Sequence, residues 1–270
     1  MEENFNFLNV MQEHLEKIGK LNPPTQAQLD RKEGITLDFS THVKYMIYAL
    51  LSNQERWIHV ENNLSEIDKV FFNYNIEKIK EKSGNYFFEK IKSYLTRGLS
   101  FEKQMKSLHK NIEILELINN ENNGDIDSYI VSKQPKEIII DFNTKYKLPN
   151  MGVSLICEYL KNVGVECAKP DTHIMRFLSK TRRGFLLKDE AHIVKKGKKI
   201  ETIWTDNDKI KALKIIENMG EKSGKTSSEI DRIIWSYCAD GKGEICTKSP
   251  KCNICVIKDR CNRDKPGVKF

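Results

Sequence analysis

The sequence predicts an all-α protein with two helical lobes. Apolar residues recur at steps of three and four positions along most of the 270-residue chain, which is the period of an amphipathic helix. Hydrophobic residues make up 39% of the chain and charged residues 31%, a balance typical of globular proteins. A chain of this length can bury one large core or two smaller ones.

Apolar faces and helix-start signals locate the individual elements. The first helix, residues 4–19, places Phe7, Met11 and Leu15 on one face and ends before Pro23-Pro24. Four further helical regions are expected. The first is a core helix at 40–52 capped by Ser40 or Thr41, and the second is a set of three or four short helices within 64–118. The third is the helix pair 134–145 and 153–163, and the fourth is a last long helix that begins with a Thr226–Glu229 capping box. Apolar residues around Gly197 instead predict a small β-hairpin within the segment 184–204.

The helix pair is joined by the tight turn Leu148-Pro149-Asn150-Met151-Gly152. This arrangement predicts a helix-hairpin-helix whose turn presents backbone N–H groups at the start of the second helix. A helix start attracts anions through its unsatisfied donors and the positive end of its dipole. A DNA phosphate is the ligand that such a turn would bind.

A single carboxylate, Asp171, follows Pro170 about twenty residues beyond the turn and opens another helix. A carboxylate can stabilise a developing cation and orient or deprotonate an attacking water. Asp is also a favoured N-cap residue, so capping alone is the competing interpretation. The two roles are compatible.

Four cysteines near the C-terminus form a C-x5-C-x2-C-x5-C run: Cys246, Cys252, Cys255 and Cys261. Thiolates spaced so closely suit iron–sulfur or zinc rather than hard cations. A [4Fe–4S] cluster is the first expectation, a structural zinc site the second, and disulfides the third. The remaining cysteines, Cys157, Cys167 and Cys238, are expected to be buried apolar groups.

The formal charge of +7 at pH 7 favours a polyanionic partner. Seven basic residues gather in the segment 181–204: Arg182, Arg183, Lys188, Lys195, Lys196, Lys198 and Lys199. The segment would be either a solvated surface loop or a phosphate-contacting one. No apolar stretch approaches the ~20 residues of a membrane span, and a cytoplasmic location, at the nucleoid in a bacterium, is the default expectation.

The order of hairpin, aspartate and cysteine run resembles the helix-hairpin-helix (HhH-GPD) DNA glycosylase superfamily, in its iron–sulfur branch with endonuclease III and the MutY-type glycosylases. The resemblance implies a bilobal fold. A six-helix barrel-type domain would cover residues 35–165 and end in the hairpin at 134–163. Residues 1–34 and 166–270 would form the second domain, with the cluster loop at 246–261.

The resemblance also implies base-excision repair on double-stranded DNA that contains a lesion or mismatch, by a monomeric enzyme. Asp171 would stabilise the oxocarbenium-like transition state after base flipping. Asn150, Gly152 and Ser154 would hold the phosphate. In Leu51-Ser52-Asn53-Gln54, which is similar to a family motif, Gln54 would fill the gap left by the extruded base, unless it is an ordinary polar residue at a helix end.

Bifunctional members of the family carry a lyase lysine two residues after the last turn glycine. This chain has Ser154 at that position, so the resemblance implies a monofunctional enzyme that uses water. Lyase chemistry by Lys161 or Lys169, a DNA-binding protein without catalysis, and a zinc-stabilised interaction module remain as alternatives.

Three departures from the family pattern indicate a divergent member. Asn150 replaces a turn glycine, the basic insertion 181–204 is long, and the first cysteine gap is one residue short. The sequence does not assign the excised base.

Overall fold

The computed structural model describes residues 5–53, 55, 57–95, 98–186, 193–196, 199–202 and 204–262, with backbone alone for 98–100 and the two strands. Gln54 lies outside these residues, so its predicted role is untested. The chain divides into two compact units. We call Thr25–Val165 the central unit, and Met1–Pro24 with Glu166–Phe270 the terminal unit.

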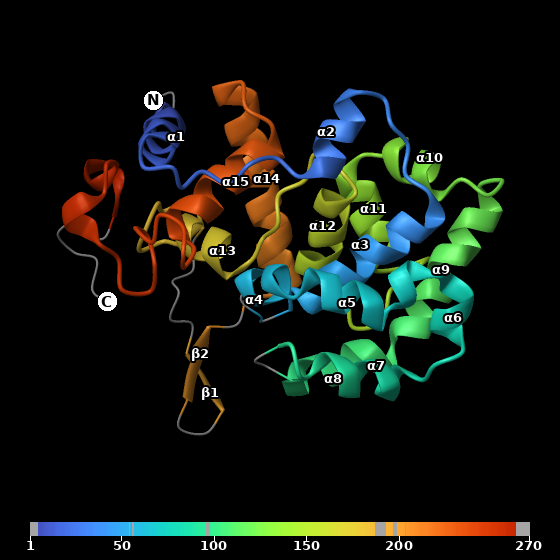
Figure 1. Cartoon of the computed structure of the whole chain (residues 1–270). Helices are drawn as coiled ribbons and strands as arrows, with labels where there is room; N and C mark the ends of the chain where they lie inside the picture. Colours follow the sequence, from blue (N-terminus) through green and yellow to red (C-terminus); the bar gives the residue numbers. More distant parts are fainter. Residues whose placement is uncertain are drawn as a thin grey trace. The chain divides into compact units, whose positions relative to one another are not determined.

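The described part of the central unit is helical throughout (Figure 1). Its elements are α2 (Gln26–Lys32), α3 (Phe39–Leu51), α4 (Trp57–Asn62), α5 (Leu64–Val70), the 3-10 turn η1 (Phe72–Tyr74), α6 (Ile76–Lys80), α7 (Gly84–Ile91), α8 (Gly98–Lys106), α9 (Leu108–Glu121), α10 (Ile126–Val131), α11 (Pro135–Asp141) and α12 (Val153–Asn162).

Helix α3 is the core helix of this unit, as its sequence predicts. Val43, Met46 and Leu50 are fully buried, and the helix contacts α8, α9, α10 and α12. The predicted cap was wrong, however. Neither Ser40 nor Thr41 caps α3, because Asp38 accepts a 2.7 Å hydrogen bond from the Thr41 N–H and the helix begins at Phe39.

The region 64–118 is divided more finely than its sequence predicts. Five α-helices, α5 to α9, occupy its described residues instead of three or four. Asn75 and Ser83 each accept a bond from an N–H in the first turn of the next helix and so start α6 and α7. A Cβ at Gly84 would lie 2.2 Å from the Met105 carbonyl oxygen, so only glycine allows this approach of α7 to α8.

Residues 25–34 pack within the central unit, whereas the sequence placed them with the terminal part. A buried polar network accounts for this difference. The Arg31 guanidinium donates two 2.5 Å hydrogen bonds to Asp127 and a 3.0 Å bond to the Val163 carbonyl. His42 lies 2.8 Å from Asp127 through Nε2 and 2.7 Å from the Tyr159 hydroxyl through Nδ1. The network joins α2, α3, α10 and α12.

The terminal unit combines helices with one β-hairpin (Figure 1). Its described elements are α1 (Phe7–Lys17), α13 (Thr172–Leu178), β1 (Ile193–Lys196), β2 (Lys199–Thr202), α14 (Asp206–Ser223), α15 (Ser227–Cys238), η2 (Cys252–Ile254) and η3 (Lys258–Arg260). The strands pair antiparallel, with Ile193 opposite Thr202, which confirms the hairpin predicted within 184–204. Helices are therefore the main class of structure, as the sequence predicts.

Helix α15 is the centre of the terminal unit and contacts α1, α13 and α14. The predicted capping box is present, because Thr226 accepts from the Glu229 N–H and Glu229 accepts from the Thr226 N–H. Helix α1 buries Phe7, Met11 and Leu15, the face that its sequence predicts. In the described part of the chain, no helix has the length and apolar content that a membrane span requires.

Candidate functional site

The predicted hairpin consists of α11 and α12 with the intervening segment 142–152. Helix α12 starts at the predicted residue, but α11 ends at Asp141 rather than at 145. The chain continues in hydrogen-bonded turns, in which the Tyr146 N–H donates to the Asp141 carbonyl at 2.8 Å and the Leu148 N–H to that of Phe142 at 3.1 Å. The first arm is thus shorter than predicted, and the connection is longer than five residues.

The turn 148–152 is held from two sides. Asn150 adopts the left-handed conformation, with φ of 59°, in which a glycine would be unstrained. Its side-chain N–H donates to the Lys103 carbonyl at 3.1 Å. The Pro149 carbonyl accepts 3.2 Å bonds from the side chains of Ser107 and Asn111. Sequence reasoning missed these two anchoring residues, because nothing in their local pattern marks them.

The start of α12 has the features of an anion site. Gly152 is the N-cap and contributes no capping side chain, and the first turn holds no acidic residue. Asn150 and Gly152 are exposed, whereas Ser154 is half-buried. The first helical bond runs from the Leu155 N–H to the Gly152 carbonyl at 2.9 Å. The three predicted phosphate-binding residues therefore share one turn at the positive end of a helix dipole.

Asp171 belongs to the terminal unit and is the N-cap of α13. Its Oδ1 accepts hydrogen bonds from the N–H groups of His173 at 2.8 Å and Ile174 at 3.0 Å. Among the residues that the structure describes, no hydrogen bond to Oδ2 occurs, and the side chain is only partly buried. The capping role is thus present, and one carboxylate oxygen is left for another ligand.

His173 follows Asp171 in the first turn of α13 and packs edge-on against Trp235, with ring centroids 6.4 Å apart. Burial lowers the pKa of His173 from its ordinary value, and the charge of Asp171 opposes this shift. The ring is therefore neutral near pH 7. Its Nδ1 is buried without a hydrogen-bond partner in the described part of the chain.

The cysteine loop, which we define as residues 246–261, follows α15 and contains η2 and η3. The four predicted ligands are all partly exposed. The Tyr237 hydroxyl donates to the Cys255 sulfur at 3.3 Å and accepts from the Val256 N–H at 3.1 Å. Cys157, Cys167 and Cys238 are buried, as predicted. Within the described residues, no three His, Cys, Asp or Glu side chains are close enough together to hold a metal ion.

The surroundings of the loop nevertheless fit a centre of negative charge. Three of the four cysteines, Cys246, Cys255 and Cys261, lie within electrostatic reach of the Arg183 guanidinium. Burial lowers the pKa of Arg183, whereas thiolate charge at Cys261 raises it. The Arg183 Nε is buried and has no hydrogen-bond partner among the described residues. The four soft sulfur donors suit iron or zinc.

Part of the predicted basic surface segment is not on the surface. Arg182 is 4% exposed and donates a 3.2 Å bond to the Thr247 carbonyl. The Asn262 N–H donates to the Arg182 carbonyl at 2.6 Å. The interpretation of Arg182 as a solvated or phosphate-contacting residue was therefore wrong, because the residue ties both ends of the cysteine loop. Lys188 and Lys198 lie outside the described residues.

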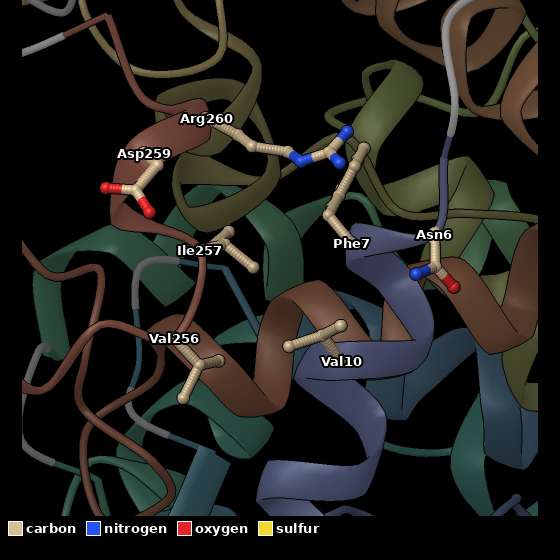
Figure 2. Close-up of a pocket in the computed structure, with 7 residues that line it drawn as sticks. All are labelled: Asn6, Phe7, Val10, Val256, Ile257, Asp259 and Arg260. Carbon is tan, nitrogen blue, oxygen red and sulfur yellow. The ribbon is translucent and has the colours of Figure 1, made fainter.

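A shallow pocket lies where α1 meets the cysteine loop (Figure 2). It is lined by Asn6, Phe7, Val10, Val256, Ile257, Asp259 and Arg260. The lining mixes polar and apolar side chains, and the pocket contains none of the predicted site residues. It reflects the packing of α1 against the loop.

Comparisons with protein-family models, with curated proteins and with solved structures find no match to this chain. The function is therefore argued from the residues and their geometry.

Proposed function

We propose that this protein is a DNA glycosylase that flips a damaged or mismatched base out of double-stranded DNA and hydrolyses its N-glycosidic bond. The observation that carries the proposal is the arrangement of Asp171. One oxygen of its carboxylate is held by two backbone N–H groups, and the side chain is partly exposed. A carboxylate that is fixed through one oxygen is oriented so that its other oxygen can stabilise a developing positive charge.

The reaction requires an anionic group beside the sugar. As the C1′–N bond breaks, its electron pair leaves with the base, and positive charge develops on the sugar. The Asp171 carboxylate would stabilise this charge. It would also accept a proton from the water whose oxygen forms the new bond to C1′. Flipping is needed because the bond is inaccessible within the duplex, and it costs a few kcal/mol.

The hairpin turn would hold the DNA backbone. Its support is the uncapped start of α12 at Gly152 and the anchoring of the Pro149 carbonyl by Ser107 and Asn111. A fixed turn keeps its N–H donors in place when a phosphate binds, so less ordering is needed on binding. Gln54 remains the proposed residue for the gap in the base stack.

We propose that the cysteine loop holds a [4Fe–4S] cluster on Cys246, Cys252, Cys255 and Cys261, with zinc as the alternative. When bound, the metal centre would rigidify a polar loop that has little apolar core of its own. It would not take part in base excision. Exposed lysines of the loop, such as Lys248 and Lys258, could then meet the DNA backbone.

Ser154 supports a monofunctional reaction, because a serine offers no amine for a Schiff base at the position where bifunctional relatives carry lysine. Lys161, one of the two other candidate amines, forms an ion pair with Glu158 at 3.5 Å. The alternative of lyase activity through another lysine predicts strand cleavage without alkali.

The test is incubation of the purified full-length protein with a panel of duplexes, each with one defined lesion or mismatch. The panel covers oxidised pyrimidines, mismatched adenine, uracil, mismatched thymine and alkylated purines. Each product is analysed with and without alkali. Nicks that appear only after alkali support hydrolysis by water. Nicks without alkali, or an adduct trapped by borohydride, contradict the monofunctional assignment. Absence of an abasic product on every duplex contradicts the glycosylase.

A second candidate function is favoured by the same residue. Because Asp171 is fully explained as an N-cap by its two bonds, the chain could be a DNA-binding protein without catalysis. That function predicts duplex binding but no abasic product on any lesion.

A further inference from the structure

The side chain of Arg183 occupies an unusual environment for a cation. Its guanidinium carbon lies 4.2 Å from the ring centroid of Phe7, 5.9 Å from that of Phe177 and 6.0 Å from that of Phe185. Phe7 and Phe177 are themselves buried. Aromatic faces attract a guanidinium, but they do not accept its N–H groups as a carboxylate does.

The polar contacts of Arg183 account for only part of its donors. One terminal N–H group donates to the Arg260 carbonyl. The Nε is buried with no partner in the part of the chain that the structure describes. Within the same residues, no carboxylate forms an ion pair with Arg183. The groups that act on it electrostatically include Arg260, which repels it, and Cys246, Cys255 and Cys261, which attract it when they are thiolates.

The position of Arg183 relative to the loop is fixed by its neighbours in sequence. The Asn262 N–H donates to the Arg182 carbonyl at 2.6 Å, and the Asn262 side chain donates to the Lys180 carbonyl at 3.2 Å. A Cβ at Gly184 would lie 2.2 Å from the Asn262 side-chain nitrogen. The segment 180–184 is thus packed directly against the end of the loop that carries Cys261.

A cation that buries an N–H donor without an anionic or polar partner is unfavourable, and Arg183 is half-buried with its Nε in that state. Four neutral thiols would leave Arg183 in that state. Four metal-bound thiolates would supply negative charge beside it and sulfur acceptors for an N–H donor. The buried, unpartnered Nε of the half-buried Arg183 is therefore explained by the loaded form of the cysteine site and not by its thiol form.

We propose that Arg183 is the counter-cation of the four-cysteine metal centre and that it stabilises the thiolate charge of the bound metal. This inference deepens the proposed function, because it rests on the metal centre of that proposal. It does not depend on glycosylase activity. Arg183 is a positioning residue that acts through the cysteines.

The experiment measures metal release from the purified holoprotein into a chromogenic chelator, with the metal identified by elemental analysis. The variants are Arg183→Gln, Arg183→Lys and the matched control Arg260→Gln. Arg260 is exposed and next to Cys261, so its substitution removes the same charge from the solvent side.

Removal of a group that supports metal ligands typically costs about 10–100-fold in affinity. Arg183→Gln should release metal faster by about that factor, whereas Arg260→Gln should resemble wild type. Arg183→Lys, which keeps the charge but loses the planar donor, should lie between them.

If the metal is an iron–sulfur cluster, its reduction potential provides a second measurement that a merely structural role would not change. Loss of this half-buried positive charge should make the potential of Arg183→Gln more negative than those of wild type and Arg260→Gln, because the reduced centre carries more negative charge.

Equal release rates in wild type, Arg183→Gln and Arg260→Gln would overturn the inference, as would a wild-type protein purified without bound metal. If the protein excises no base but Arg183→Gln releases its metal faster than wild type, the role of Arg183 is supported and the glycosylase proposal fails. The two proposals are therefore tested separately.

Discussion

Asp171 shows how one side chain can serve the fold and the proposed chemistry. Its Oδ1 caps α13 through the N–H groups of His173 and Ile174, a role that asparagine fills equally well. The proposed catalytic role requires the negative charge, which asparagine lacks. The two roles can therefore be separated by a substitution that keeps the acceptor and removes the charge.

Asp171→Asn is expected to reduce base excision by about 10²–10⁴-fold while the thermal midpoint stays near that of wild type. Single-turnover rates on the best duplex of the panel and thermal unfolding provide the two measurements. Asp171→Ala should lose the activity and also about 1 kcal/mol of stability, because the cap is removed.

The matched control for this prediction is Asp38→Asn, which makes the same change at the N-cap of α3. It should leave excision unchanged. An Asp171→Asn protein that excises bases at the wild-type rate would show that Asp171 is a cap only.

At the scale of elements, the hairpin depends on a backbone conformation that most residue types do not favour. Asn150 has a φ of 59°, and most L-residues lose about 1–2 kcal/mol in this left-handed region. Asparagine tolerates it, and here its side chain also binds the Lys103 carbonyl. Asn150 thus adopts a conformation that glycine would also adopt.

Asn150→Gly should therefore preserve the turn and the affinity for duplex DNA, whereas Asn150→Ala should lose about 1–2 kcal/mol of stability and bind DNA more weakly. Urea denaturation and fluorescence anisotropy with a duplex that contains a stable abasic-site analogue measure the two effects. If Asn150→Ala binds as tightly as Asn150→Gly, the turn conformation is not needed for DNA binding.

The network around Asp127 joins four helices of the central unit, and its removal is expected to be costly. Asp127 is 1% exposed and accepts from Arg31 and His42. Asp127→Asn leaves the Arg31 cation without its partner and should cost about 3–5 kcal/mol of unfolding free energy. Asp125→Asn, two residues earlier at an exposed N-cap, should change stability little. Similar losses in both variants would contradict the role of the network.

The same network predicts a dependence of stability on pH. Burial raises the pKa of Asp127, but the hydrogen bonds from Arg31 and His42 lower this pKa by more than burial raises it. The net pKa of Asp127 is therefore well below its ordinary value. The ionised form is thus favoured by folding. Its contribution is fully present above the unfolded pKa of about 3.9 and decreases as pH falls below that value. The stability difference between wild type and Asp127→Asn should narrow between about pH 4 and pH 2 in urea denaturation. A constant difference would contradict this assignment.

At the scale of the whole molecule, the charge of +7 favours binding to a polyanion. The salt dependence of binding to duplex DNA, the proposed partner, tests this expectation. Each phosphate contact that is neutralised on a duplex contributes about 0.9 to the slope of log affinity against log salt concentration. Lys248 is exposed in the cysteine loop, so Lys248→Gln should reduce the slope by about 0.9 if it contacts a phosphate. Lys69, which is paired with Glu66 at 2.6 Å, provides the control, and Lys69→Gln should leave the slope unchanged.

Much of the local structure was predictable because its signals are local. The start of α12, the buried face of α1 and the Thr226–Glu229 capping box follow from periodicity and short-range hydrogen bonds. The predictions were wrong where several residues compete for the same local role. Asp38, Ser40 and Thr41 can each cap α3, and the difference among them is too small for the sequence pattern to resolve.

The sequence by itself determined the helical class, the order of hairpin, aspartate and cysteines, and the residue types that the proposed chemistry needs. Only the tertiary structure decided that the Nε of Arg183 is buried beside the cysteine loop, that Ser107 and Asn111 anchor the turn, and that Arg31 joins the central unit. These contacts join residues that are far apart in the chain. Their partners are selected by the packing of whole helices, which no short window of sequence encodes.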